Sequence, residues 1–351
     1  MKIIHKIILA AATLLLSVSC AKEENIVNDD EPVTITIGAA MKAAGDASGT
    51  DEDYYINSFR MLGYRSSTGI LAFNEMVFGL PATSTANRKE IEEYVNVKTG
   101  NFTIVFIANE HSDPALSAAL QAIDSVTNNT LAHLRTLAFL DTAFDTNKNI
   151  PMSAIFQNIS IYSDNTLLDP TNPAHTAPVP KWTLLLTRLG IRIDIKLTLT
   201  EEQKDAWLGG SGAYKVNFNN VPKKVYIFPD IENSSDRFTN FEKEVTLTPA
   251  TPPQDPYYGL TWIYRGLRII LPETNSPALL ESEALTMRIM EGATPRTGVI
   301  TTTGAGVYTI PRNHYINVKA GMSALIVFDA TVLPWMNILI EADDIQGPIQ
   351  P

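Results

Sequence analysis

The amino-acid sequence predicts an all-β protein with minor helices, built from β-sandwiches. Apolar and polar residues alternate with a period of two in many short segments, which is the pattern of strands that bury one face. Turn-forming residues separate these segments, and only two short stretches have a helical pattern. Many strands at short spacing with turns between them are typical of β-sandwiches.

The first strand is expected where Val33, Ile35 and Ile37 alternate with threonines. Phe102–Ala108 is apolar on both faces, which is typical of a central strand in a covered sheet. The other strand candidates, in chain order, are Tyr54–Tyr64, Ile155–Tyr162, Lys224–Phe228, Trp262–Leu271, Leu285–Met290, His314–Lys319, Leu325–Leu333 and Trp335–Glu341.

One long strand is expected from Trp182 to Leu199. Its apolar residues alternate with Arg192, Asp194 and Lys196. This alternation predicts one buried face and one solvent-exposed face, with the three charged side chains on the exposed face.

Two short helices are expected between strands. Asp113 and Pro114 supply a cap and a first-turn proline for a helix over Ala115–Ile123. A second helix is expected over Thr130–Phe139.

The chain length and a proline-dense run indicate two domains. The 351 residues exceed what one ordinary core organises. The prolines between Asp169 and Pro180 cannot lie inside a sheet. We therefore predict an N-terminal β-sandwich domain over residues 33–180 and a C-terminal one over residues 181–351.

The N-terminal residues have the pattern of an export signal. Residues 1–19 combine a basic start with an apolar stretch too short to span a bilayer. Cys20 follows directly and is the only cysteine, so an internal disulfide is impossible. We predict that Cys20 is acylated and that residues 20–32 form a tether on a lipoprotein. The alternative is an ordinary signal peptide, since Ser17 stands where a lipobox usually carries leucine.

The composition argues against several classes of function. The net charge of −11 leaves no basic stripe for nucleic acid. Five scattered histidines and one cysteine provide no metal site, and no cofactor-binding or nucleophile motif is present. We therefore expect no enzyme activity, no metal and no cofactor. Aromatic platforms for sugars are a weaker possibility than core packing for the four tryptophans, which are Trp182, Trp207, Trp262 and Trp335.

Several local patterns, in order along the chain, resemble the Bacteroidales fimbrillins, the subunit family of type V pili. After the acylatable cysteine and acidic tether come a first strand and then five short motifs. These motifs are Thr103–Asn109, Ile150–Ser153, Leu186–Asp194, Pro311–Tyr315 and Val332–Trp335.

The resemblance implies two transthyretin-like β-sandwich domains and a structural role in a cell-surface fimbria that contributes to adhesion and biofilm. In this family a trypsin-like surface protease removes the lipidated first strand from an outer-membrane precursor. A strand from the C-terminal region of another fimbrial subunit then fills the vacated groove.

Residue by residue, the resemblance implies cleavage between Lys42 and Ala43, because Lys42 is the only basic residue between Lys22 and Arg60. The removed strand would contain Val33, Ile35 and Ile37. The residues of the candidate donor strands are Leu325, Val327, Ile338 and Ile340. The sequence leaves open which of these strands donates.

Three other interpretations stay open at this point. The chain resembles a stalk subunit, but a lipid-retained anchor or a tip subunit of the same fimbria fits the same motifs. A surface glycan-binding lipoprotein is the alternative from another class. An enzyme comes third, because the sequence gives no positive evidence for one.

Overall fold

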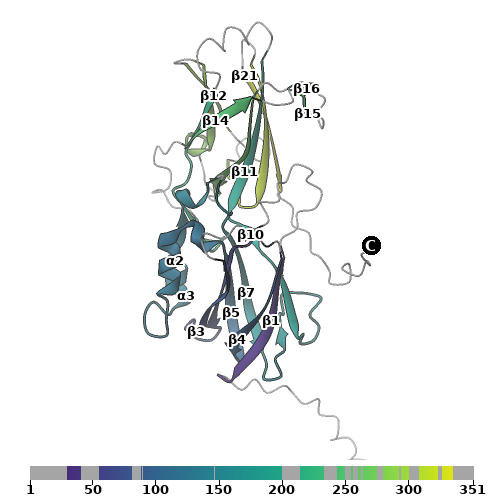
Figure 1. Ribbon diagram of the computed structural model, residues 1–351. Helices are drawn as coiled ribbons and strands as arrows, with labels where there is room; N and C mark the ends of the chain where they lie inside the picture. Colours follow the sequence, from purple (N-terminus) through teal and green to yellow (C-terminus); the bar gives the residue numbers. More distant parts are fainter. Residues whose placement is uncertain are drawn as a thin grey trace, which may run out of the picture.

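The computed structural model describes about two thirds of the chain, and most of that part is β-strand (Figure 1). The predicted all-β fold with minor helices is therefore confirmed. The described residues are 30–40, 55–80, 88, 90–145, 147–199, 214–232, 243–249, 254–255, 260–261, 264–274, 280–291, 294–299, 308–322 and 326–334.

Residues 32–188, which we call the first half, form two sheets that share one core. A three-stranded sheet has the order β4-β1-β9, and a six-stranded sheet has the order β10-β7-β5-β2-β3 with β8 paired to β7. These strands are β1 (Pro32–Ala40), β2 (Ser58–Arg65), β3 (Leu71–Gly79), β4 (Glu90–Lys98), β5 (Gly100–Ala108), β7 (Met152–Ile161), β8 (Leu167–Leu168), β9 (Lys181–Leu185) and β10 (Thr187–Arg188). As the sequence predicted, β5 is a central strand, paired on both sides.

Residues from Gly190 onward, which we call the second half, form an eight-stranded sheet of order β19-β18-β12-β14-β17-β11-β20-β21. Its strands are β11 (Gly190–Leu199), β12 (Tyr214–Asn219), β14 (Lys243–Pro249), β17 (Tyr264–Pro272), β18 (Thr286–Glu291), β19 (Thr294–Val299), β20 (His314–Met322) and β21 (Ile326–Pro334). Two small sheets pair β6 (Ala138–Leu140) with β13 (Lys224–Tyr226) and β15 (Gln254–Asp255) with β16 (Leu260–Thr261).

The strand expected from Trp182 to Leu199 is three strands. β9 pairs with β1, and β10 pairs with β7, so both belong to the sheets of the first half. Only β11 joins the eight-stranded sheet. The strands therefore pass from one set of sheets to the other between Arg188 and Gly190, eight residues beyond the predicted boundary at residue 180.

The charged face of β11 is buried, so the prediction of an exposed face is wrong. Arg192 and Asp194 are 1% and 2% exposed, and two hydrogen bonds of 3.1 and 3.0 Å join them. Asp194 also accepts a 2.8 Å bond from the backbone N–H of Arg268, which has a φ of 55° beside a β-bulge. The carboxylate thus stabilises an unusual backbone conformation in the neighbouring strand. A period-two pattern cannot tell such a covered polar face from a solvated one.

The core between the two sheets of the first half is aromatic. Phe106 stacks on Phe59 with ring centroids 5.2 Å apart, and Trp182 contacts Phe106 and Phe156 edge-on. Trp182 is fully buried, so core packing explains it and a sugar platform at this residue is excluded. The other three tryptophans lie outside the described residues.

The helices are short and lie on one side of the first half (Figure 1). In α2 (Pro114–Gln121), the Asp113 side chain accepts hydrogen bonds from two backbone N–H groups, as the sequence predicted. α3 (Leu131–Leu134) is shorter than expected, with Thr130 as its cap. The 3-10 turns are η2 (Glu110–Ser112), η3 (Asp141–Ala143) and η5 (Glu281–Glu283). Among the described residues, no helix has the length and apolar character needed to cross a membrane.

Asn109 connects three segments where β5 ends. Its backbone is left-handed, with a φ of 61°. Its side chain accepts a 2.8 Å bond from the Asn57 N–H and donates bonds of 2.9 and 2.8 Å to the carbonyl oxygens of Tyr55 and Ile150. Asparagine tolerates this backbone conformation better than most residues. This one residue therefore adopts the left-handed backbone and also supplies the three hydrogen bonds.

We predict that Asn109→Ala lowers the free energy of unfolding by about 2–4 kcal/mol, because it leaves buried polar groups without partners. Asn128 is an exposed residue with a similar φ of 56°, so Asn128→Ala is the matched control. This control should lower the free energy of unfolding by about 1 kcal/mol, because it affects only the left-handed backbone conformation. Urea unfolding of the two variants separates these contributions, and equal losses would contradict the role assigned to the Asn109 side chain.

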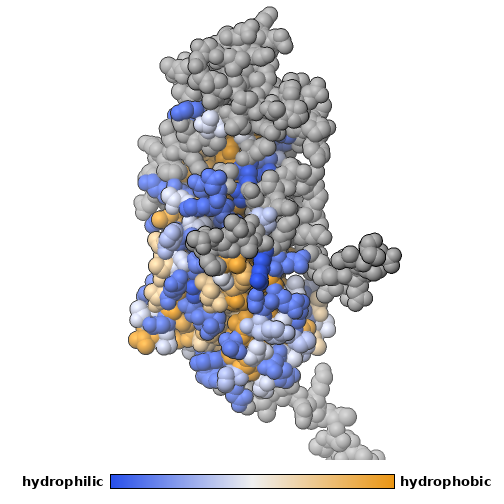
Figure 2. All heavy atoms as spheres, in the orientation of Figure 1, coloured by the Kyte–Doolittle hydropathy of each residue, from blue (hydrophilic) through white to orange (hydrophobic). Residues whose placement is uncertain are grey.

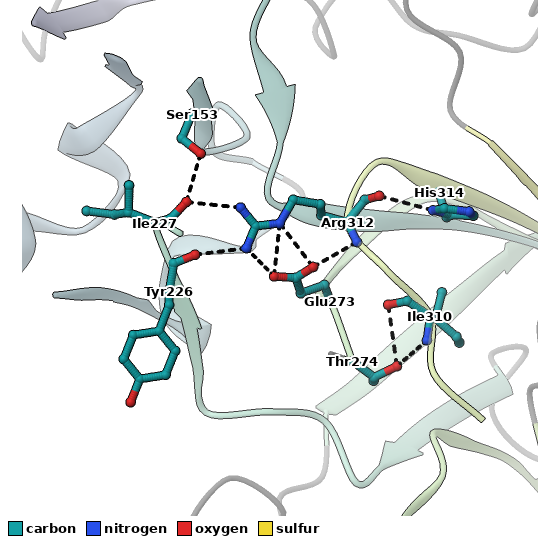
Figure 3. Close-up of polar contacts among 8 residues, drawn as sticks. All are labelled: Ser153, Tyr226, Ile227, Glu273, Thr274, Ile310, Arg312 and His314. Carbon is teal, nitrogen blue, oxygen red and sulfur yellow. Dashed lines mark hydrogen bonds and ion pairs between the residues drawn. The ribbon is translucent and has the colours of Figure 1, made fainter. Parts of the chain in front are cut away.

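The two halves meet through a polar junction (Figure 3). Arg312 donates bonds of 3.0 and 3.1 Å from Nε to the Glu273 carboxylate. It also donates bonds of 3.1 and 2.9 Å to the backbone carbonyl oxygens of Ile227 and Tyr226. Ser153 of β7 donates to the same Ile227 oxygen at 3.0 Å. The segment around Ile227 is therefore held by both halves at once.

Candidate functional site: the groove of the first strand

The first strand lies in the middle of the three-stranded sheet, between β4 and β9. β1 pairs antiparallel with β4 from Pro32 to Ala40, and parallel with β9 from Thr36 to Ala40. Both neighbours of β1 therefore belong to residues 32–188. Within the described residues it makes no strand pairing with β20 or β21.

β1 fills part of the core with one face. The side chains of Ile35 and Ile37 are fully buried, and Val33 is 8% exposed. All three belong to the hydrophobic cluster that also contains Trp182. If β1 left, the groove between β4 and β9 would lose this apolar layer and two sets of backbone hydrogen bonds.

The outer face of the same sheet is polar. Thr34 donates a 2.7 Å hydrogen bond to Asn96, and Lys181 and Glu92 form an exposed ion pair of 2.5 Å. A side chain at Gly38 would meet the Lys181 side chain at 3.2 Å. The visible face of the first half is a mixture of hydrophilic residues with scattered hydrophobic ones (Figure 2).

The start of β1 is fixed by charges and by backbone bonds. The carboxylate of Asp30 forms an ion pair with Arg65 and lies 3.6 Å from the ammonium of Lys98. Thr99, just after β4, exchanges hydrogen bonds with Asp30 and Glu31: two link backbone groups, and one joins the Glu31 N–H to the threonine hydroxyl. Sequence reasoning treated Asp30 only as part of a tether. Because its partners lie far away in the chain, no local pattern could have revealed this contact.

We predict that Ile35→Ala destabilises the uncleaved chain by about 2–5 kcal/mol, because it leaves a cavity in a closed core. Thr36 is the next residue of the same strand, with a partly exposed side chain. Thr36→Ala should cost less than about 1 kcal/mol. Urea unfolding of the chain from residue 21 measures both values, and a loss below 1 kcal/mol for Ile35→Ala would contradict the packing of β1.

Most other predicted site residues lie outside the described residues. These are Cys20, Lys42, Ala43, Leu325, Ile338 and Ile340. Val327 lies in β21, where its backbone pairs with Gly321 of β20.

A buried ion pair that the sequence did not reveal lies under α2. Arg60 donates hydrogen bonds of 2.6 and 2.9 Å to Glu110, which is fully buried. Ser117 donates a third bond to this carboxylate at 2.9 Å. The pair is fully satisfied and holds α2 against β2. In the described part of the chain, no group of three or more His, Cys, Asp or Glu side chains could hold a metal ion.

The fold and the groove define a class of protein: an all-β protein whose first strand is held in the core by strand pairing and apolar packing. The comparison with known families gives one match. Residues 32–188 match the family described as "Major fimbrial subunit protein (FimA)". These residues are less than half of the chain, and over them the chain is similar to the fimbrillins, so the resemblance seen in the sequence is confirmed for this part.

Solved structures show the same fold across most of the chain. The tip fimbrial protein Mfa3 from Porphyromonas gingivalis is 16% identical, with a TM-score of 0.55 over 86% of this chain and 100% of that one. A fimbrilin from Porphyromonas gingivalis W83 is 15% identical, with a TM-score of 0.51 over 90% of this chain and 100% of that one. Among curated protein sequences, the comparison finds no match.

The match over residues 32–188 supports a role as a fimbrial structural subunit. Such a role implies a place at the cell surface and contact with other fimbrial subunits. The same match also fits a structural role and not an enzymatic one.

Proposed function

We propose that the protein is a stalk subunit of a type V pilus that polymerises by donor-strand exchange after proteolysis and contributes to adhesion and biofilm. The observation that carries the proposal is the place of β1, paired on both sides and packed into the core. A strand in this position leaves a defined groove when it is removed, and only another strand can fill that groove completely.

The energetics favour refilling of the groove. Losing Val33, Ile35 and Ile37 from the core forfeits about 1.5–3 kcal/mol of apolar burial for each side chain. It also leaves unpaired backbone groups on β4 and β9, which form a template for strand addition. An incoming apolar strand restores both contributions, so assembly follows removal.

Removal of β1 is assigned to proteolysis after Lys42, two residues beyond the end of the strand. The precursor is held on the outer membrane by a lipid on Cys20, after removal of residues 1–19. A trypsin-like surface protease then releases residues 20–42 with their lipid and leaves Ala43 as the new N-terminus. The freed subunit joins other fimbrial subunits at the surface.

We also propose that the two halves are transthyretin-like β-sandwich domains. The strand pairings support a boundary between Arg188 and Gly190 in place of the one at residue 180. The match to the family model also ends at residue 188.

N-terminal sequencing of subunits from isolated fibres tests the proposal. The expected sequence begins at Ala43. Subunits that still carry residue 20 would overturn the stalk assignment and favour a lipid-retained anchor. Electron microscopy of cells that lack this chain should show fibres lost or shortened, and normal fibres would contradict a stalk role.

A further inference from the structure

A side-chain ion pair crosses the outer face of β1 from one wall of its groove to the other. Lys181 belongs to β9 and Glu92 to β4, and their charged groups meet at 2.5 Å. Because β1 lies between these two strands, the walls are two strand spacings apart, about 9–10 Å. Two long side chains extended over the intervening strand can bridge this distance. We call this ion pair the strap.

The strap passes over Gly38 of β1. Gly38 is aligned with Glu92 in the antiparallel ladder, and Thr36, its neighbour on the same face, is aligned with Lys181 in the parallel ladder. Along this outer face the positions of β1 become more covered toward the strap: Thr34 is exposed, Thr36 is partly buried and Gly38 is buried. A residue on the polar side of the sheet is thus buried where the ion pair crosses.

Glycine leaves room for the strap. A Cβ atom at position 38 would lie 3.2 Å from Cε of Lys181 and 3.4 Å from the hydroxyl oxygen of Thr183. The first of these contacts is already tight, so a larger side chain has to displace the lysine. Glycine is otherwise unfavourable within a strand, because it loses much conformational freedom on folding and packs no side chain. The crossing ion pair explains why Gly38 stands in a strand that is paired on both sides.

We propose that the strap is a gate on the groove: β1 leaves only when Lys181 and Glu92 separate, and the closed strap accepts only a strand without a bulky side chain at the crossing position. The inference rests on the proposed removal of β1 and adds the residues that control it. The strap selects its occupant by excluding larger side chains and not by attracting a particular one. Both charges belong to the walls, so they remain in the subunit after residues 20–42 have gone.

The strap regulates a strand that is held mainly by other interactions. The buried side chains of β1 and its backbone pairing on both sides provide most of the binding energy. The side chains of Lys181 and Glu92 are 45% and 56% exposed, and an ion pair at this exposure shifts an equilibrium by about fivefold at most. The gate therefore changes how often β1 opens without deciding whether the sheet folds.

Hydrogen exchange of the uncleaved chain from residue 21 tests whether the strap breaks when β1 opens. Mass spectrometry follows the backbone amides of residues 32–40. Glu92→Gln should accelerate their exchange by about three- to fivefold, because the open state has already lost the ion pair. If β1 could leave beneath an intact strap, this substitution would leave the exchange unchanged, and the gate would be overturned.

Asp230→Asn is the matched control. It removes an ion pair with Arg135 that is equally short, at 2.5 Å, with side chains 38% and 62% exposed. This pair lies on the helical side of the chain and does not cross β1, so Asp230→Asn should leave the exchange of residues 32–40 unchanged. Equal acceleration by Asp230→Asn and Glu92→Gln would overturn the gate, because β1 would then open only when the whole chain unfolds.

A charge exchange separates the ion pair from the effect of either residue alone. Lys181→Glu places two carboxylates over β1 and should accelerate exchange more than Glu92→Gln does. Adding Glu92→Lys restores an ion pair of opposite direction and should bring the rate back to within about twofold of the unsubstituted chain. Absence of this recovery would contradict the strap.

A substitution at Gly38 tests the selection by size. Threonine is favoured over glycine in strands, so without the strap Gly38→Thr should slow the exchange of residues 32–40. In the otherwise unsubstituted chain it should instead accelerate exchange by about threefold, because the new side chain displaces Lys181. In the Lys181→Ala background the sign should reverse. Slower exchange in both backgrounds would overturn the selection by the strap.

These experiments can fail independently of the proposed function, because they use the uncleaved chain and need no fibre. Glu92→Gln without effect on residues 32–40 would overturn the gate and leave strand exchange standing. Fibre subunits that retain residues 20–42 would overturn the proposed function, and the gate would then have no removal of β1 to control.

Discussion

Cells whose only copy of the chain carries Lys42→Ala are expected to keep it as an unprocessed, lipid-bound precursor and to display no fibres built from it. A trypsin-like protease needs a basic residue at the cut. Lys42 is the only lysine or arginine between Lys22 and Arg60. Without cleavage, β1 stays in its groove and no strand can enter. Immunoblots of membrane and shed fractions, with electron microscopy, measure the expected loss.

Two further substitutions control this experiment. Lys42→Arg keeps the basic side chain and should leave both processing and fibres intact. Lys22→Ala removes the neighbouring basic residue within the tether and should also leave fibres unchanged. Fibres of normal length from the Lys42→Ala chain would show that cleavage at this position is not the trigger.

The elements of the first half could be predicted from local patterns because each one is encoded locally. Three such patterns are each visible within about ten residues: the alternation in β1, the run in β5 that is apolar on both faces, and the Asp113 cap of α2. The charged face of β11 could not be predicted in this way. Whether Arg192 and Asp194 face solvent depends on what covers the sheet, and the covering segments are distant in the sequence.

The groove was predictable only in part, for the same reason. The sequence indicated which residues of β1 are buried, but the partners of this strand lie fifty or more residues away in β4 and still farther away in β9. Asp30 illustrates the limit most clearly. The acidic residues around it predict a tether, whereas its ion pair with Arg65 fixes it two residues before β1 begins.

Several motifs that suggested the family meet at the junction between the halves. Asn313 has a left-handed backbone with a φ of 61°. Its N–H donates to the Gly190 carbonyl at 3.0 Å, and its side chain accepts a 3.1 Å bond from Arg188. Leu189 in turn donates from its backbone N–H to the Pro151 carbonyl at 2.8 Å. Motifs separated by more than a hundred residues thus share one structural role, which is to fix one half against the other.

Nearby, a second ion pair reaches the same connecting segment from the helical side. Arg135 contacts Asp230 at 2.5 Å and stacks over Phe228 with 4.8 Å between its guanidinium carbon and the ring centroid. The hydrogen bond from Arg135 lowers the pKa of Asp230 below its usual value. Because both side chains are more than a third exposed, this pair should contribute less to the free energy of unfolding than the buried pair of Arg312 and Glu273.

Glu273→Gln is therefore expected to lower the free energy of unfolding by about 3–5 kcal/mol, among the largest effects of any single substitution in the second half. The side chains of Arg312 and Glu273 are only 9% and 3% exposed, and removing one charge leaves the other buried without compensation. Replacing both together, as Arg312→Met with Glu273→Leu, should cost less than Glu273→Gln alone, because no unpaired charge then remains.

Glu92→Gln, at the exposed pair with Lys181, is the matched control and should cost less than about 1 kcal/mol. Urea unfolding followed by tryptophan fluorescence measures all three variants. Because Arg312 also holds Tyr226 and Ile227 beside Ser153 of the first half, Glu273→Gln should loosen the junction as well as the sheet. Proteolysis within residues 220–232 should then become faster. An effect of Glu273→Gln no larger than that of Glu92→Gln would mean that the apolar core, and not this ion pair, joins the two halves.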